Sequence, residues 1–157
     1  MKEIKYVKGD ATNPIGEGRK ILIHCCNTIG VMGAGIAKTI RNKWPIVYVE
    51  YNKTYISKGL NLGETQFIKV NNDLVVANMI GQEGIGFVNG IPPIRYEAID
   101  SCLKRVSETA KKYNASVHAP RICCGLAGGK WETIEKLIVK NLCENDIGVT
   151  IYDFEGE

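Results

Sequence analysis

A predicted strand, a glycine-rich loop and a predicted helix follow one another directly within Ile21–Ile40, ILIHCCNTIGVMGAGIAKTI. The run Ile21–Cys26 predicts a strand buried on both faces. Asn27 and three glycines follow, and helical spacing of apolar residues begins at Ala34. Glycines let a backbone approach an anion, and the free N–H groups of a first helical turn point at it. Tight turns also need glycine for steric reasons alone, so this segment by itself leaves a ligand loop and a plain turn open.

The rest of the chain alternates strand and helix patterns, which predicts an α/β sandwich with a mixed sheet. The predicted strands are Ile4–Val7, Glu64–Val70, Leu74–Ile80, Ser116–Ile122 and Val149–Phe154, and the second and third of these form an expected hairpin. The predicted helices are Ala34–Lys43, one that begins at Pro45 and fades by Lys58, Pro93–Tyr113 and Trp131–Asn145.

A second glycine-rich loop, Cys123–Lys130, also follows a predicted strand and precedes a helix. Loops at the carboxyl ends of parallel strands open on one edge of the sheet. Two facing loops with helix N-termini suit a diphosphate better than a single phosphate. The long loop Gly81–Pro93 is of a length that is usually functional or mobile.

Length and charge narrow the alternatives. A chain of 157 residues predicts one domain, residues 1–157. The net charge of +3 is too small to favour nucleic acid as a partner. No apolar run approaches the length of a membrane span, and the N-terminus lacks the pattern of a signal peptide, so we expect a cytoplasmic protein with no membrane partner.

The six cysteines are interpreted as free thiols that behave as small hydrophobic residues, with a metal site as the alternative. No C-x-x-C spacing occurs, and two adjacent pairs do not suit one tetrahedral site. We therefore predict no metal and no cofactor. Cys124, in the second glycine-rich loop, is a candidate for lining a pocket.

Several motifs resemble those of macro domains. They are Val7–Thr12 (VKGDAT), His24–Asn27 followed by Met32–Ala37, Pro120–Ile122 with Cys124–Leu126 and then Trp131, and the final strand Val149–Phe154. They occur in the family's order and span nearly the whole chain. The resemblance implies a three-layer α/β/α sandwich with a mixed central sheet and a cleft for ADP-ribose or a derivative. It is greatest to stand-alone macro domains that either remove phosphate from ADP-ribose 1''-phosphate or release ADP-ribose from acidic residues of proteins.

The resemblance also assigns roles. Asp10 accepts a hydrogen bond from the adenine amine, Asn27 binds the distal ribose, and Tyr152 or Phe154 packs on adenine. The ligand-binding set that it implies is Gly9, Asp10, Ala11, Asn27, Met32, Gly33, Ala34, Gly35, Ile36, Cys124, Gly125, Leu126, Ala127, Gly128, Gly129, Tyr152 and Phe154. The alternatives are a turn residue for Asp10 and Asn27, and ordinary strand packing for the two aromatic residues.

The catalytic expectation is less direct. Where protein-hydrolysing relatives carry a lysine and an aspartate, this chain has Gln82 and Ala127. The candidate catalytic residues are His24, which matches the phosphatases and titrates near neutrality, and Asn27. A hydrogen-bonded core histidine is the alternative for His24, and Glu83 is a second candidate base. Substrate-assisted attack, in which a diphosphate oxygen orients the water, needs no protein base.

Three functions are therefore open at this stage. The first is a hydrolase of ADP-ribose derivatives, with ADP-ribose 1''-phosphate as the first substrate and ADP-ribosylated macromolecules as the other. The second is a module that binds ADP-ribose without turnover. The third, a nucleic-acid binder, is disfavoured by the charge balance and by the lack of a basic aromatic stripe.

Overall fold

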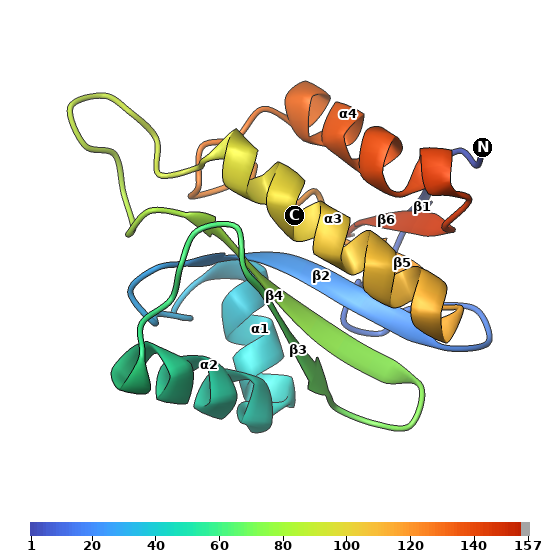
Figure 1. Ribbon diagram of the computed structural model, residues 1–157, viewed down its shortest axis with the longest axis horizontal. Helices are drawn as coiled ribbons and strands as arrows, with labels where there is room; N and C mark the ends of the chain where they lie inside the picture. Colours follow the sequence, from blue (N-terminus) through green and yellow to red (C-terminus); the bar gives the residue numbers. More distant parts are fainter. Residues whose placement is uncertain (155–157) are drawn as a thin grey trace.

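The computed structural model describes residues 1–154, and its centre is a six-stranded sheet with the order β1-β6-β5-β2-β4-β3 (Figure 1). The strands are β1 Lys5–Lys8, β2 Lys20–Asn27, β3 Thr65–Lys69, β4 Leu74–Gln82, β5 Ser116–Ala119 and β6 Val149–Asp153. The pairs β1/β6, β6/β5, β5/β2 and β2/β4 are parallel, whereas β3 and β4 form the expected antiparallel hairpin. The prediction of a mixed sheet is confirmed.

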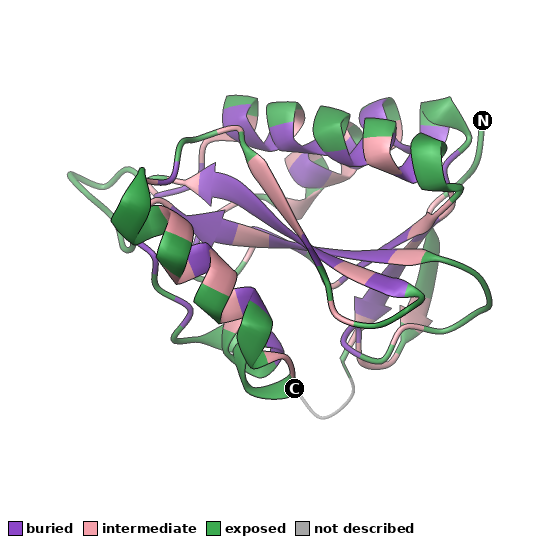
Figure 2. Ribbon diagram, turned by 60° about the horizontal axis from the view of Figure 1, so that its bottom comes forward, coloured by how far each residue is buried: buried purple, intermediate pink, exposed green. Residues whose placement is uncertain are grey.

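Helices cover both faces of this sheet. They are α1 Gly35–Lys43, α2 Pro45–Ser57, α3 Tyr96–Tyr113 and α4 Trp131–Asn141, followed by the 3-10 helix η1 Cys143–Asn145. The first two lie on one face and α3 and α4 on the other, with the buried strands between them (Figures 1 and 2). This is the three-layer α/β/α sandwich that the resemblance implied.

Strand β2 shows why the central run is apolar throughout. Ile21 and Ile23 belong to the core beneath α3 and α4, whereas Leu22 and Cys26 belong to the core beneath α1 and α2. Successive strand side chains point to opposite faces, so a strand covered on both faces is apolar at nearly every position. The predicted double-sided burial is confirmed.

Helix α3 begins at Tyr96, three residues later than predicted. The Arg95 guanidinium donates hydrogen bonds to the carbonyl oxygens of residues 92, 93 and 94. Ile94 also forms an isolated bridge with Gln82. These bonds hold the segment before Tyr96 in an extended path, which the apolar spacing alone did not reveal.

Strand β5 and helix α4 are also shorter than predicted. The strand ends at Ala119, and Pro120, which follows it, has no N–H to donate to a neighbouring strand. Helix α4 ends at Asn141, after which η1 tightens the last turn. Among the helices of residues 1–154, none has the length and apolar character needed to cross a membrane. The single-domain organisation stays a prediction, with which one continuous sheet is consistent.

Candidate ligand-binding cleft

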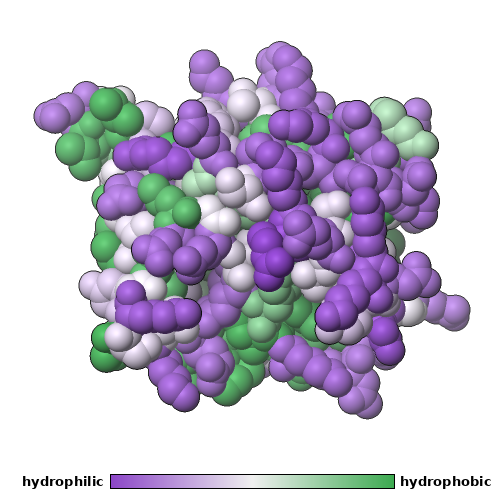
Figure 3. Space-filling model, viewed as in Figure 1, coloured by the Kyte–Doolittle hydropathy of each residue, from purple (hydrophilic) through white to green (hydrophobic). Residues whose placement is uncertain are grey.

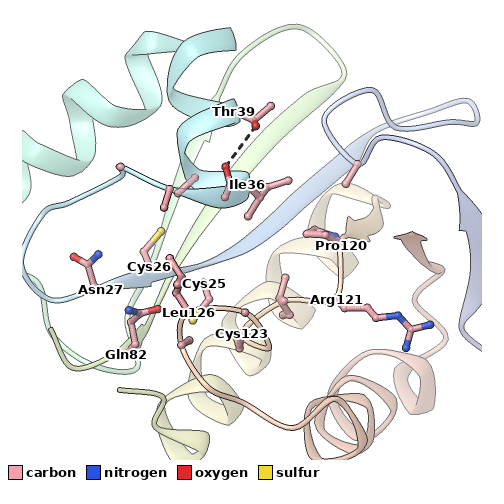
Figure 4. Close-up of a pocket in the computed structure, with 18 of the residues that line it drawn as sticks. Cys25, Cys26, Asn27, Ile36, Thr39, Gln82, Pro120, Arg121, Cys123 and Leu126 are labelled. Atoms are coloured by element: carbon pink, nitrogen blue, oxygen red, sulfur yellow. Dashed lines mark hydrogen bonds between the residues drawn. The ribbon is translucent and has the colours of Figure 1, made fainter. Parts of the chain in front are cut away.

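A cleft of about 1340 Å³ opens at the carboxyl edge of the sheet, between the loops that follow β2 and β5 (Figure 4). Strands β2 and β5 are adjacent in the sheet, but β2 is followed by α1 on one face and β5 by α4 on the other. The two connecting loops therefore diverge and leave a crevice between them. The first loop contributes Asn27, Val31 and residues 33–35, and the second contributes Cys123 and residues 125–127. The expectation that both glycine-rich loops open on one edge is confirmed.

The N-terminus of α1 faces this cleft without a side-chain cap. Ala34 occupies the N-cap position in an extended conformation, and it makes no capping hydrogen bond. The N–H groups of Gly35, Ile36 and Ala37 have no partner within the helix, and all three residues line the cleft. No acidic residue lies in the first turn to offset the positive end of the helix dipole. This end of the cleft wall is built to receive an anion.

Two glycines set the path of the first loop. Gly35 has φ +56°, and a Cβ placed on it would meet no atom within 4 Å. Gly30 has φ +75°, and its Cβ would lie 2.7 Å from the Tyr55 ring. The loop therefore passes so close to α2 at Gly30 that a side chain there does not fit, whereas the space beside Gly35 is open.

Asn27 folds the first loop with its side chain. Its Oδ1 accepts hydrogen bonds from the N–H groups of Ile29 and Val31, at 3.1 and 3.2 Å, and lies 2.8 Å from the Tyr51 hydroxyl. Its Nδ2 donates to the Val31 carbonyl at 2.7 Å. The residue is 6% exposed and lines the cleft. Asn27 therefore serves as a turn residue, and one Nδ2 hydrogen is left for a ligand.

His24 does not lie in the cleft. It is fully buried, its Nε2 shares a hydrogen bond with Asn78, and it is absent from the lining residues of the described chain. Burial lowers the pKa of His24 to about 4, against the smaller effect of the Asn78 hydrogen bond. The imidazole does not reach a molecule in the cleft, so we do not carry the catalytic role predicted for His24 into the proposed function.

Two backbone N–H groups of the second loop form hydrogen bonds within the loop itself. The Gly128 N–H donates to Gly125 O at 3.0 Å, and the Gly129 N–H donates to Cys123 O at 2.7 Å. A Cβ on Gly129 would lie 2.4 Å from that same Cys123 oxygen, so glycine is required for this closure. Residues 125–127 line the cleft and keep their N–H groups available, whereas residues 128 and 129 shape the loop from outside the lining.

Two other predicted contacts lie away from the cleft. Met32 is 1% exposed and packs in the core beneath α1 and α2, and it is absent from the lining. The Cys124 thiol donates to Ile122 O at 3.2 Å and is also absent from the lining, whereas its neighbour Cys123 is present. Both predictions followed from position in a motif.

Charged groups gather at one end of the cleft. Asp10 Oδ1 accepts hydrogen bonds from the N–H and the hydroxyl of Thr12, at 2.8 and 2.7 Å. The Arg121 guanidinium donates to both carboxylate oxygens of Asp153, at 2.7 and 3.2 Å. This pairing lowers the pKa of Asp153. Gly9 and Ala11, both in the predicted set, also line this end.

The two aromatic candidates differ in freedom. The Tyr152 hydroxyl accepts from the Ile15 N–H at 2.9 Å and lies 2.7 Å from Nδ1 of His118. Tyr152 is 2% exposed, whereas Phe154 is 55% exposed, and both line the cleft. Tyr152 is therefore a fixed wall of the cleft, and Phe154 is free to pack on a ligand.

The opposite end, at Asn27, is uncharged. Among the described lining residues this end carries Val31, Gln82, Ile85, Phe87 and Leu126. The Gln82 Nε2 donates to Gly84 O, and Glu83 is exposed and outside the lining. In Figure 4, Asn27 and Gln82 lie at the end away from Arg121.

Sequence reasoning named the long loop but missed its lining residues. Ile85 and Phe87 are 58% and 61% exposed, and Val88 and Ile91 are comparably exposed at the tip. Figure 3 shows hydrophobic side chains on this projecting loop. Four large apolar residues in a glycine-rich loop were an available signal. Within residues 1–154, no group of three or more His, Cys, Asp or Glu side chains is arranged to hold a metal ion.

Comparison with known proteins agrees with this geometry. The family model of the Macro domain matches residues 23–138. A relative named ADP-ribose 1''-phosphate phosphatase, from Candida albicans, is 29% identical over 86% of this chain and 91% of its own length. One solved structure, of a protein of unknown function from Bacteroides thetaiotaomicron, has a TM-score of 0.95 and 49% identity over 97% of this chain and 98% of its own.

A chromodomain-helicase-DNA-binding protein 1-like from Danio rerio is 30% identical over 95% of this chain. The chain spans only 15% of that relative's length. The fold and the cleft define a three-layer α/β protein with an anion-binding crevice at the carboxyl edge of its sheet. The chain belongs to the Macro domain family.

Proposed function

We propose that this protein binds ADP-ribose in the cleft and hydrolyses an ADP-ribose derivative at the distal ribose. One observation carries the proposal: the uncapped N-terminus of α1 and residues 125–127, whose N–H groups have no hydrogen-bond partner within residues 1–154, line a single crevice. Donors on opposite banks suit a diphosphate, which presents oxygens on both sides. The relative named as an ADP-ribose 1''-phosphate phosphatase supports the choice of ligand.

The distribution of charge orients the ligand. The free oxygen of Asp10 is an acceptor for the adenine amine, and the exposed Phe154 ring provides a surface for the base. The distal ribose then lies at the Asn27 end, where the remaining Nδ2 hydrogen of Asn27 can donate to a ribose hydroxyl.

Turnover in this orientation depends on the substrate itself. The Asn27 end carries no acidic or basic side chain among its described lining residues, so no side chain is placed there to activate water. A diphosphate oxygen held by α1 accepts the proton of the attacking water. As the water oxygen bonds to the distal ribose carbon, the bond to the substituent breaks, and the departing group takes up the proton.

Two substrates follow. ADP-ribose 1''-phosphate is supported by the phosphatase relative. ADP-ribose joined to a macromolecule is favoured by the uncharged Asn27 end, because a 1''-phosphate would find no cation among the described residues that line it. A cationic ribose, as forms in glycosidic cleavage, would also be stabilised by the nearby diphosphate.

The test is a product assay with purified protein. ADP-ribose 1''-phosphate and an ADP-ribosylated protein are each incubated with it, and release of phosphate or of ADP-ribose is measured. Calorimetry with ADP-ribose runs alongside. Release of either product above a heat-inactivated control supports a hydrolase. Binding without release favours the second candidate, a non-catalytic module, which the missing side-chain base supports. Failure to bind ADP-ribose overturns both.

A further inference from the structure

Five of the six free thiols, all except Cys26, lie in or pack against the core on one face of the sheet. Cys25 is on β2 and packs against the same core cluster as Cys102 of α3 and Cys123, whereas Cys26 belongs to the core of the opposite face. Strands β2 and β5 are adjacent and parallel, with Leu22 opposite His118. Continuing that register three residues beyond the last pair brings Cys25 opposite Arg121, two residues before Cys123. Figure 4 shows Cys25 and Cys123 next to each other.

Further observations link these two thiols. A hydrogen bond to Cys25 raises the pKa of the Cys123 thiol, although burial is the larger cause. Both residues line the cleft, and Cys102 and Cys124 do not. Cys25 is half-buried and Cys123 is 7% exposed. A small molecule dissolved in the cleft therefore meets Cys25 first and finds Cys123 behind it.

We propose that Cys25 and Cys123 form a thiol-modification site in the cleft floor, which a peroxide converts to a disulfide that weakens ligand binding. The inference uses the proposed ADP-ribose binding as one readout. The site itself rests on the shared core face, the adjacent strands and the common lining.

The chemistry balances with hydrogen peroxide as the oxidant. The Cys25 sulfur attacks one peroxide oxygen, an S–O bond forms, the O–O bond breaks and one water leaves. The Cys123 sulfur then attacks the Cys25 sulfur, the S–S bond forms, the S–O bond breaks and a second water leaves. Two thiols lose two electrons and two protons, and one peroxide becomes two waters. The thiolate is the nucleophile in each step, and burial raises the pKa of the Cys123 thiol, so the second step is slow and the reaction is measured at its end point.

The bond would disturb the ligand loops. Cys123 has φ +66°, and its carbonyl oxygen closes the second loop by accepting from Gly129 N–H. A disulfide holds two Cβ atoms about 3.8 Å apart, so it draws Cys123 toward β2. The N–H groups of residues 125–127 move with it, away from their position opposite α1.

The test oxidises the full chain with hydrogen peroxide and maps the cross-link by peptide mass spectrometry. We expect a peptide pair joined through Cys25 and Cys123, about 2 Da lighter than the reduced pair. We expect ADP-ribose affinity to fall at least tenfold and to return after dithiothreitol. Saturating ADP-ribose, added before the peroxide, should block the cross-link.

Three variants make the outcome specific. Cys25→Ser and Cys123→Ser should each remove the oxidant effect, whatever their own starting affinity. Cys143→Ala, outside the cleft, should keep it. A cross-link through another pair of cysteines, or an unchanged affinity in protein carrying the Cys25–Cys123 bond, overturns the inference. Because mapping needs no ligand, a reduced protein that fails to bind ADP-ribose sinks the proposed function while the cross-link is still scored.

Discussion

The two carboxylate oxygens of Asp10 have different roles, one in the fold and one in the proposed ligand site. One oxygen accepts two hydrogen bonds from Thr12, which fixes the turn after β1. Within residues 1–154 the second oxygen has no hydrogen-bond partner, and Asp10 lines the cleft. The turn-residue alternative and the ligand role therefore coexist in one side chain, and a substitution can separate them.

Asp10→Asn should separate these roles. The asparagine keeps an acceptor for Thr12 but replaces the free acceptor oxygen with an N–H donor, which faces the adenine amine unfavourably. We expect ADP-ribose affinity to fall about tenfold, in line with about 1–3 kcal/mol for a hydrogen bond to a charged group. Calorimetry with inosine diphosphate ribose is the matched comparison. Its base presents a carbonyl, so the variant should bind it better than ADP-ribose, and an unchanged preference for adenine would contradict the orientation.

Residue types could be predicted from the sequence, but their hydrogen-bond partners could not. The glycines of both loops and the asparagine at the end of β2 followed from turn chemistry and from the resemblance. That Asn27 uses its amide on Ile29 and Val31, and that Gly129 closes on Cys123, depend on distances that form only after folding. His24 shows the same limit, because a strand pattern does not say whether a histidine points to the cleft or into a core.

At the scale of elements, α1 carries the binding argument. It is nine residues long and is uncapped, and it has basic residues Arg41 and Lys43 in its last turn. That arrangement leaves the positive end of the dipole uncompensated where it meets the cleft. An anion bound there would accept hydrogen bonds from the first N–H groups of the helix, as a capping side chain does in other helices.

Gly35→Glu should abolish ADP-ribose binding. The carboxylate would stand at the helix N-terminus, occupy the open space beside residue 35 and repel the diphosphate. We expect no heat of binding in calorimetry and no thermal stabilisation by ADP-ribose.

Gly59→Glu is the matched control for that variant. Gly59 also has a positive φ, +84°, and open space at its Cβ, but it follows α2 and is outside the cleft lining. The same backbone strain and the same added charge should leave affinity unchanged there. If both variants lost ADP-ribose affinity equally, the loss would come from backbone strain, and the anion site at α1 would be contradicted.

Element types were predictable, and several ends were not. Different signals located the elements: a continuous apolar run for β2, Pro45 for the start of α2, and apolar residues at helical spacing for α3 and α4. The start of α3 depends on Arg95 folding back on three carbonyl oxygens, a tertiary event without a periodic signature. The strand order depends on which faces α1 and α4 cover, and no local pattern encodes that.

At the scale of the whole molecule, two buried imidazoles on the sheet face covered by α1 and α2 link stability to pH. His24 and His118 are 0% and 3% exposed, and burial lowers the pKa of each to about 4, aided for His118 by the charge of Lys20. The unfolded chain binds protons near the ordinary histidine pKa of about 6.5. Between these values the unfolded state holds more protons, so the free energy of unfolding falls as pH falls from about 6.5 to about 4 and is preserved above 6.5.

His24→Gln tests this link and the structural placement of His24 together. The loss for His24 across its window is about 3 kcal/mol, at about 1.4 kcal/mol per pH unit. Chemical denaturation at pH 7 and at pH 4.5 should show a smaller decrease in the variant than in the parent, even if the variant is less stable at both. The glutamine offers Asn78 an amide in place of the imidazole.

A catalytic histidine exposed to the cleft would keep an ordinary pKa, so an identical pH dependence in parent and variant would contradict the buried position. ADP-ribose affinity, measured at pH 7, should change little, because the imidazole lies outside the cleft lining.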